Sequence, residues 1–438
     1  MRKTLKFFPI VLIILGAIGC DYNTVNTTVK EETTLSYLME FGYSAYDLTK
    51  KKSIEKSIEK FQDENPTITI KLETASYDNY TTELNKRVTD NNPPDIITMW
   101  AQDVADYNEQ GYLTDLKKFI KLDQLNDEDY FYDKFNDLFV IEGELLAIPN
   151  QYNSIGVFYN KKWFDNANIG YPSDEWTWEE FMETAKELKA FNQSEYGVVF
   201  PFGLEFIEPL IISLGGSILS PDFSKASGYL NNKQSLKAFK WVYDLIKLQK
   251  LSPVESSGNW RTPLQMLTTN EVGMAIGWSA YSTNNIIPDI TSGISDERYS
   301  YVALPHFKEG IRVTSSSATG IGISSKSKNA QASWKFLRSI LLDNNEMSQQ
   351  LAGGNWITPK TAYQDVLKTN PNKVNYVNEL DYIVPNVNNK IKEWYNIHYQ
   401  INKSEMTNFI NSDESSLQLF LDELALKLDK MLDNLKGE

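Results

Sequence analysis

The sequence predicts an α/β fold built as two lobes. Strand-like segments alternate with helix-like segments, which is typical of sheets covered by helices. The segment DIITMW (residues 95–100) is a short, continuous apolar run, as expected for a strand buried on both faces of a mostly parallel sheet. The chain has 438 residues, which is enough for two or three domains of ~150 residues each.

The first half of the chain shows this alternation directly. Residues 33–39 are expected to form a strand, and a helix should follow because Ile54, Ile58 and Phe61 recur at helical spacing. Residues 67–74 alternate apolar and polar side chains, as a half-buried strand does. A second helix is then predicted from its apolar face, made of Tyr80, Leu84 and Val88.

Four further helices are predicted beyond residue 170. Thr177 and Glu180 have the spacing of a capping box, which starts a helix. Apolar periodicity predicts helices over 233–250 and 329–342, and another from Ser412 to near the end. We expect this last helix to pack on the protein's own core, because its polar face mixes charges of both signs.

The composition excludes several functions. The chain carries 43 Lys and Arg against 58 Asp and Glu, a net charge of −15, whereas nucleic-acid binding relies on basic side chains that neutralise phosphates. Its single cysteine, Cys20, permits neither an intrachain disulfide nor a cysteine-based zinc site. His306 and His398, the two histidines, lie far apart. We therefore expect no metal, no cofactor and no nucleic-acid partner.

The N-terminus resembles that of a bacterial lipoprotein. Residues 7–18 are mostly apolar and follow basic residues, which predicts a signal peptide over 1–19 because a bilayer span needs about 20 residues. The sequence Ala-Ile-Gly-Cys that ends at Cys20 resembles a lipobox, although Ala17 replaces the usual leucine. Cys20 would carry the lipid, with palmitate among its chains. Residues 20–32 would form a flexible tether on the extracytoplasmic face of the membrane.

Several segments in order resemble one protein family. They include KFQDENPTITIKLETASYDNYTTELNKRVTDNNPPDIITMW, LLAIPNQYNSIGVFYNKKWFDNANI, PSDEWTWEEFMETAKELKA, EPLIISLGGSI, VGMAIGWSAY, ATGIGISSKSKNAQASWKFLRSILL and LAGGNWITPKTAY. Each is weak alone, but together they cover nearly all of residues 33–365. They are similar to the extracellular solute-binding proteins of sugar-type ABC importers, the family that includes maltose-binding proteins.

This resemblance implies a periplasmic-binding-protein (Venus flytrap) fold, with the ligand in a cleft between the lobes. One lobe would contain 33–150 and about 320–350, and the other 151–319 and about 351–438. The chain would cross first near 150–154 and return near 319–324. The implied function is that of a non-enzymatic, membrane-anchored receptor that captures a sugar or oligosaccharide and delivers it to ABC permease subunits.

A sugar site needs aromatic rings for the apolar faces of the sugar and amide or carboxylate groups for its hydroxyls. Trp100 and Gln102 follow a predicted strand, Asn153 lies in the inter-lobe connection, and Trp278 occupies the family's glycine–tryptophan segment. For each aromatic residue, packing in a core is the competing interpretation. By resemblance the candidate ligand-binding residues are Phe41, Tyr43, Trp100, Gln102, Asn153, Glu205, Trp278 and Trp356.

Other functions stay open on the residues alone. Gly277–Tyr281 resembles a nucleophile elbow but lacks the second glycine. A surface glycosidase would need two carboxylates, and the sequence singles out no such pair. A polyamine or ferric iron could replace the sugar, and an adhesion or sensor protein could keep the same fold. The chain has no phosphate-binding GxxxxGK[ST] motif, so it is not predicted to be the transporter's ATPase.

Overall fold

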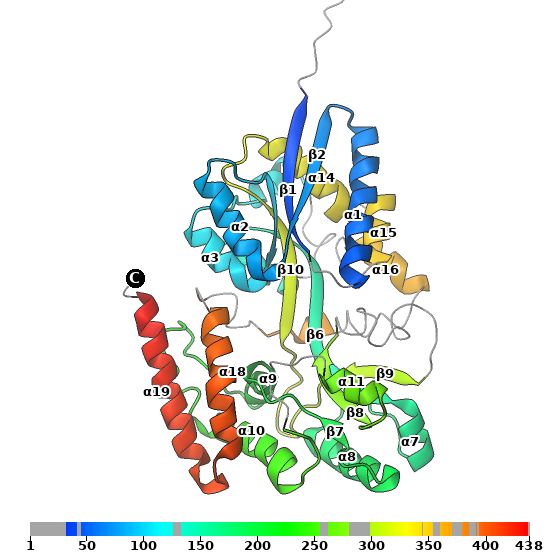
Figure 1. Ribbon diagram of the computed structural model, residues 1–438, viewed down its shortest axis with the longest axis vertical. Coiled ribbons are helices and arrows are strands. Elements are labelled where there is room, and N and C mark those ends of the chain that lie inside the picture. Colours follow the sequence, from blue (N-terminus) through cyan, green and yellow to red (C-terminus); the bar gives the residue numbers. More distant parts are fainter. Residues whose placement is uncertain are drawn as a thin grey trace, which may run out of the picture.

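The computed structural model describes residues 32–41, 45–125, 133–254, 262–279, 298–343, 345–353, 360–369, 379–384, 391 and 394–436. These residues form two lobes joined by two long strands (Figure 1). Each lobe has a large apolar core of its own, one centred on strands from the first 150 residues and one on helices that follow residue 155. None of the helices in this part of the chain combines the length and the apolar character that a bilayer span requires.

The first lobe is a sheet flanked by helices. Its strands are β1 (Thr33–Glu40), β2 (Ile68–Ala75) and β3 (Ile96–Trp100), with the small hairpin β4 (Val140–Ile141) and β5 (Glu144–Leu145) beside them. Its helices are α1 (Ala45–Glu64), α2 (Tyr77–Thr89), α3 (Val104–Glu109), α4 (Lys117–Leu122), α6 (Asp133–Asn136), α14 (Ala330–Leu341), α15 (Glu346–Gly353) and α16 (Lys360–Thr369). Short 3-10 turns are η1 (Ala101–Asp103), η2 (Asp137–Phe139) and η5 (Glu379–Tyr382).

The second lobe contains a smaller sheet and more helix. Its strands are β7 (Val198–Val199), β8 (Met274–Trp278) and β9 (Tyr299–Ala303). Its helices are α7 (Lys161–Ala167), α8 (Trp178–Asn192), α9 (Leu204–Ser213), α10 (Lys233–Tyr243), α11 (Thr262–Thr268), α18 (Trp394–Asn411) and α19 (Leu417–Lys436), with a π turn η3 (Asp244–Leu248) and a 3-10 turn η7 (Glu414–Ser416).

Strands β6 (Ile148–Asn160) and β10 (Ser316–Ile323) connect the lobes (Figure 1). The first half of β6 pairs with β10, and its second half, from Ile155 onward, pairs with β8 and β9. This change of partner falls between Ser154 and Ile155, at the end of the segment where the sequence predicts the first crossing. A Cβ atom on Gly156 would lie 2.4 Å from the ring of Tyr301, so glycine lets β9 approach β6 closely.

The sheets are mixed, whereas the sequence predicts mostly parallel ones. β1 is parallel to β2 and β3, and β7 is parallel to β8, but β10 is antiparallel to β3 and β6, and β6 is antiparallel to β8 and β9. The reason is the crossing itself, because one strand leaves the first lobe while the other returns to it. The two-lobe α/β architecture is confirmed, and its strand directions are more mixed than expected.

The helices form where apolar spacing and caps predict them. Thr177 accepts a hydrogen bond from the backbone N–H of Glu180, and the Glu180 side chain accepts one from Thr177, so the predicted capping box starts α8. In α1, Ile54, Ile58 and Phe61 are buried in the first core. The predicted C-terminal helix is α19, whose buried face packs in the second core through Leu417, Leu421, Leu424, Ala425 and Leu428.

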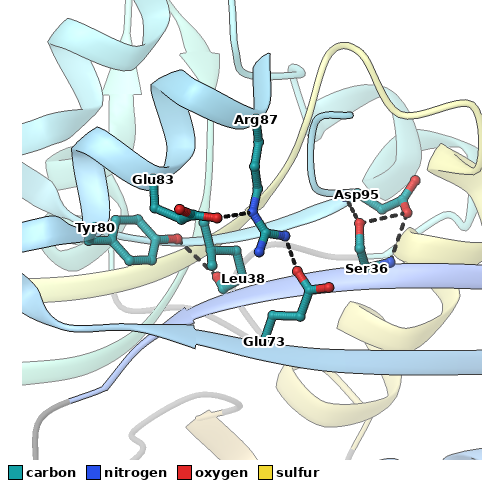
Figure 2. Close-up of polar contacts among 7 residues, drawn as sticks. All are labelled: Ser36, Leu38, Glu73, Tyr80, Glu83, Arg87 and Asp95. Atoms are coloured by element: carbon teal, nitrogen blue, oxygen red, sulfur yellow. Dashed lines mark hydrogen bonds and ion pairs between the residues drawn. The ribbon is translucent and has the colours of Figure 1, made fainter. Parts of the chain in front are cut away.

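Polar contacts hold the outer layers of the first lobe to its sheet (Figure 2). Arg87 of α2 forms an ion pair with Glu73 of β2 and donates to Glu83 at 2.7 Å. The Tyr80 hydroxyl of the same helix donates to the backbone carbonyl oxygen of Leu38 at 2.9 Å. These bonds fix α2 across β1 and β2, and so fix the strand ends that meet at the inter-lobe side.

The lobe assignment of the residues after about 351 differs from the sequence prediction. The sequence places residues from about 351 onward in the second lobe. In the structure Leu351, Leu380 and Ile383 pack in the first core. Ile391 and the apolar residues of the helices after it pack in the second core. The chain therefore crosses a third time after residue 383, because α15 packs against α14 and η5 against α6 in the first lobe. The remaining lobe boundaries stay predictions.

Candidate functional site

In β3, β6, β8 and β10, as in β9 with its Ser300, every residue but one is buried. All other residues of β6 are buried, but Asn153 is partly exposed. Ser317 is the corresponding exception in β10, Trp100 in β3 and Trp278 in β8. Three of these four, Trp100, Asn153 and Trp278, are residues that the sequence singles out for ligand contact.

The strand register brings the four residues to the junction of the lobes. Asn153 lies directly opposite Ser317, where β6 pairs with β10. Two residues further along β6, Ile155 lies opposite Trp278. Side chains two residues apart in a strand point to the same side, and paired residues share a face of the sheet. Asn153, Ser317 and Trp278 therefore lie along one face of the connection.

Trp100 joins the same face from the first lobe. Thr319 of β10 lies opposite both Trp100 of β3 and Gln151 of β6. Gln151 precedes Asn153 by two residues, so the row from Trp100 through Thr319 to Gln151 adjoins the Asn153–Ser317 pair. A β-bulge lies next to this row, between Thr319 and Gly320, and bulges often re-aim side chains beside sites.

Acidic groups surround Trp100. Its indole N–H donates to the carboxylate of Glu40, the last residue of β1. Asp103 follows in η1, where burial, and then the charges of Asp106 and Glu40, raise the pKa of its carboxyl group to about 7. The carboxyl ends of the parallel strands β1 and β3 meet here, which is the edge where open α/β sheets bind ligands.

The other first-lobe candidates lie at the same edge. Phe41 follows β1, is partly buried against the first core, and donates its backbone N–H to the carbonyl oxygen of Ala75 at 2.8 Å. Gln102 is partly buried in η1, between Trp100 and Asp103. Tyr43 and Trp356 lie outside the described residues, as does Cys20 with the predicted signal peptide.

In the second lobe, Trp278 meets the start of α9. Its ring centroid lies 6.3 Å from that of Phe206, with the planes inclined at 59°. Glu205 is the neighbouring residue, and its backbone carbonyl oxygen accepts a 3.5 Å hydrogen bond from Ser315, just before β10. Glu205 and Phe206 are thus held beside the connecting strands.

Helix α18 orients the Glu205 carboxylate. The Asn402 amide donates to Glu205 Oε2 at 2.8 Å, and His398 Nε2 lies 3.4 Å from the same oxygen. The Asn402 side-chain oxygen also accepts a 2.9 Å hydrogen bond from the backbone N–H of Leu204, a group in the first turn of α9. One turn later Glu208 is buried, and burial followed by the charge of Glu205 raises the pKa of Glu208 to about 8.

Sequence reasoning missed four residues of this arrangement. Ser317 pairs with Asn153, Glu40 holds Trp100, and His398 and Asn402 hold Glu205. Only Glu40 had a usable signal, since it directly follows the strand predicted over 33–39, at the edge where ligands bind. The others depend on pairing between segments more than 150 residues apart.

The residues of this face supply indole rings, an amide and hydroxyls, and carboxylates from both lobes lie beside them. That set can cover apolar ring faces and exchange hydrogen bonds with several hydroxyls at once. Ser279 belongs to the segment that resembles a nucleophile elbow. Its hydroxyl oxygen accepts a 2.9 Å hydrogen bond from the backbone N–H of Ser154 in β6. No group of three or more His, Cys, Asp or Glu in the described part of the chain could hold a metal ion.

A family model for bacterial extracellular solute-binding proteins matches residues 47–347. The chain belongs to this family. A putative binding protein of Brucella abortus is 24% identical over 293 residues, which are 63% of this chain and 65% of that protein. The chain thus matches slightly under two thirds of that relative's length. The multiple sugar-binding protein of Streptococcus mutans is 22% identical, over 74% of this chain and 77% of its own.

Solved structures of the same architecture support the fold. An ABC substrate-binding protein of Listeria monocytogenes, solved in complex with cycloalternan, superposes with a TM-score of 0.72 at 21% identity, over 93% of this chain and all of the other. The sugar-binding protein MalE of Xanthomonas citri gives a TM-score of 0.75 at 15% identity, over 92% and 98% of the two chains.

Proposed function

We propose that this solute-binding protein captures a carbohydrate between its lobes and delivers it to the permease subunits of an ABC importer. The observation that carries the proposal is the placement of Trp100, Asn153, Ser317 and Trp278. Each is the one incompletely buried residue of its strand, and the register sets them on one face of the connection.

The chemistry of these residues favours a hydroxyl-rich ligand. Indole rings pack on the CH faces of a sugar, and each hydroxyl that leaves water needs a new hydrogen bond. Asn153 can donate and accept such bonds, and the Glu205 carboxylate can accept them. Two similar proteins have names that agree with a sugar: the Streptococcus mutans relative and the Listeria monocytogenes structure with cycloalternan.

Each lobe would contribute contacts to the ligand. Trp100 belongs to the first lobe and Trp278 to the second, so only a closed arrangement of the lobes lets both contact one ligand. The ligand would stabilise that closed form through the contacts it gains there. The permeases would recognise the closed form. No bond of the solute would be made or broken, and the lipid on Cys20 would hold the protein at the extracytoplasmic face of the membrane.

A thermal-shift screen tests the ligand class. Mono- and oligosaccharides, polyamines and ferric iron are each added to the purified protein, and the melting temperature is recorded. A saturable rise with one sugar class supports the proposal, because a ligand that binds only the folded state stabilises it. Stabilisation by a polyamine or iron alone, or hydrolysis of a chromogenic glycoside that requires one particular carboxylate, would replace it.

A further inference from the structure

The third crossing of the chain brings a buried ion pair to the boundary between the lobes. Before this crossing, Leu380 and Ile383 anchor η5 in the first core. After it, Ile391 and Trp394 lie in the second core. Residues 379–383 and 391–394 thus belong to different lobes, which adds a crossing to those made by β6 and β10.

Arg312 reaches this segment from the second lobe. The preceding residue, Ile311, donates its backbone N–H to Ser213 of α9 at 3.0 Å. Arg312 Nη1 also lies 3.6 Å from Glu175 Oε1, next to the start of α8. The backbone next to Arg312 and one of its guanidinium nitrogens thus contact second-lobe elements.

The tip of Arg312 contacts η5. Its guanidinium group forms an ion pair with the Glu379 carboxylate and lies over the Tyr382 ring, with 4.0 Å from Cζ to the ring centroid. The side chains of Arg312 and Glu379 are only 7% and 2% exposed. We call Arg312, Glu379 and Tyr382 the Arg312 cluster. It joins residues fixed to different lobes.

The Arg312 cluster lies beside the point where β6 changes partner. Thr314, two residues after Arg312, donates its backbone N–H to the carbonyl oxygen of Tyr382 at 3.0 Å. Its hydroxyl donates to the carbonyl oxygen of Ile155 at 3.0 Å. Atoms close to a rotation axis move little when domains rotate, so contacts at this place tolerate a small rotation of the lobes but would break in a large one.

A buried charge is tolerated only when it is paired, and a guanidinium group that is both paired and stacked has little freedom to rearrange. We infer that the Arg312 cluster is a third tie between the lobes, which limits the hinge to a narrow range of openings and so positions the two halves of the proposed site. Arg312 and Glu379 would be positioning residues, without contact to the ligand. Only the effect on ligand affinity rests on the proposed function.

Distances between the lobes test this inference without any ligand. Spin labels are placed on the full chain with Cys20→Ser, at Lys86→Cys in α2 and Glu183→Cys in α8, whose side chains are 68% and 67% exposed. The double variant Arg312→Met with Glu379→Leu removes both charges together, so that no unpaired charge is left buried. We expect the width of the inter-label distance distribution to grow roughly twofold.

The matched control breaks an ion pair within a single lobe. Arg338 of α14 pairs with Asp123 at 2.8 Å, and Arg338→Met should leave the distance distribution as it is in the parent protein. If the Arg312 double variant does not fold, Arg312→Lys replaces it, since lysine keeps the charge but loses the planar fork and the stacking, and a smaller broadening is expected.

A distribution as narrow as that of the control would overturn the inference, whether or not a sugar binds. If the thermal-shift screen has found a ligand, its affinity should also fall by about tenfold in the double variant, because the two halves of the site are less preorganised. If the distance distribution broadens in the double variant but no sugar binds in the screen, the Arg312 cluster still connects the lobes and the proposed function is wrong.

Discussion

Asn153 of β6 and Ser317 of β10 are directly paired across the two strands that join the lobes. Each is the one residue of its strand that is not fully buried. Polar side chains at this place can contact a ligand from the centre of the molecule, while Trp100 and Trp278 approach it from the two lobes.

Asn153→Ala should weaken carbohydrate binding tenfold to about a hundredfold, since an unmade hydrogen bond to a desolvated hydroxyl costs roughly 1–3 kcal/mol. Isothermal titration calorimetry with the sugar found in the screen measures the change. Asn408→Ala, on the exposed side of α18, is the control and should bind as the parent protein does. Equal affinities of the two variants would remove Asn153 from the site.

Trp278→Ala should lower affinity by more than tenfold, because the ring face that covers the sugar is lost. Phe191→Ala removes an aromatic ring that is 53% exposed elsewhere in the second lobe, and it should bind normally. Quenching of intrinsic tryptophan fluorescence on titration gives both affinities. Unchanged binding by the Trp278 variant, with folding intact, would place the ligand elsewhere.

Trp100→Phe separates two roles of this residue. The variant keeps an aromatic face but loses the N–H that donates to Glu40. We expect a moderate loss of affinity, about threefold to tenfold, because the ring would no longer be held in one orientation. If Trp100→Ala is no worse than Trp100→Phe in the same titration, the ring face makes no contact with the sugar.

Glu205 and Asn402 should act as one unit. Asn402→Ala removes the donor that orients the Glu205 carboxylate, so its effect on affinity and that of Glu205→Gln should be less than additive in the double variant. A coupling free energy of at least about 0.5 kcal/mol is expected from a double-mutant cycle by calorimetry. Strict additivity would show that Asn402 does not act through Glu205.

The buried Glu208 should make stability fall as pH rises. Its pKa is raised to about 8 in the folded protein, so over the range up to that pH the folded state keeps a proton that the unfolded chain has lost. The free energy of unfolding should fall by at most about 1.4 kcal/mol per pH unit. Urea unfolding from about pH 5 to about pH 8 should show a smaller decline in Glu208→Gln than in the parent protein. Identical pH profiles would contradict the assignment.

Much of the fold could be predicted from local sequence patterns. The apolar spacing of Ile54, Ile58 and Phe61 and the capping box of Thr177 and Glu180 act within one segment, and they mark α1 and α8 correctly. Strand direction was only partly predictable, because the antiparallel pairing of β6 and β10 joins segments more than 150 residues apart. The first-lobe packing of Leu380 and Ile383 was hidden for the same reason.

In the candidate site, too, local sequence patterns were predictable and contacts between distant segments were not. Trp100 and Trp278 end short apolar strands, a position that the sequence itself displays. Ser317 has no such mark, because its place beside Asn153 is set by register. Asn402 is one amide among many on α18, and only the packing of that helix against α9 brings it to Glu205. Contacts between distant segments were therefore the unpredictable part.

Small-angle X-ray scattering of the full chain, with and without a saturating concentration of the sugar found in the screen, tests the central claim most directly. Capture between two lobes predicts a smaller radius of gyration in the presence of the sugar, and Trp278→Ala should need a more than tenfold higher sugar concentration for the same decrease. A radius of gyration that stays the same when calorimetry shows the sugar to be bound would contradict closure of the lobes around the ligand.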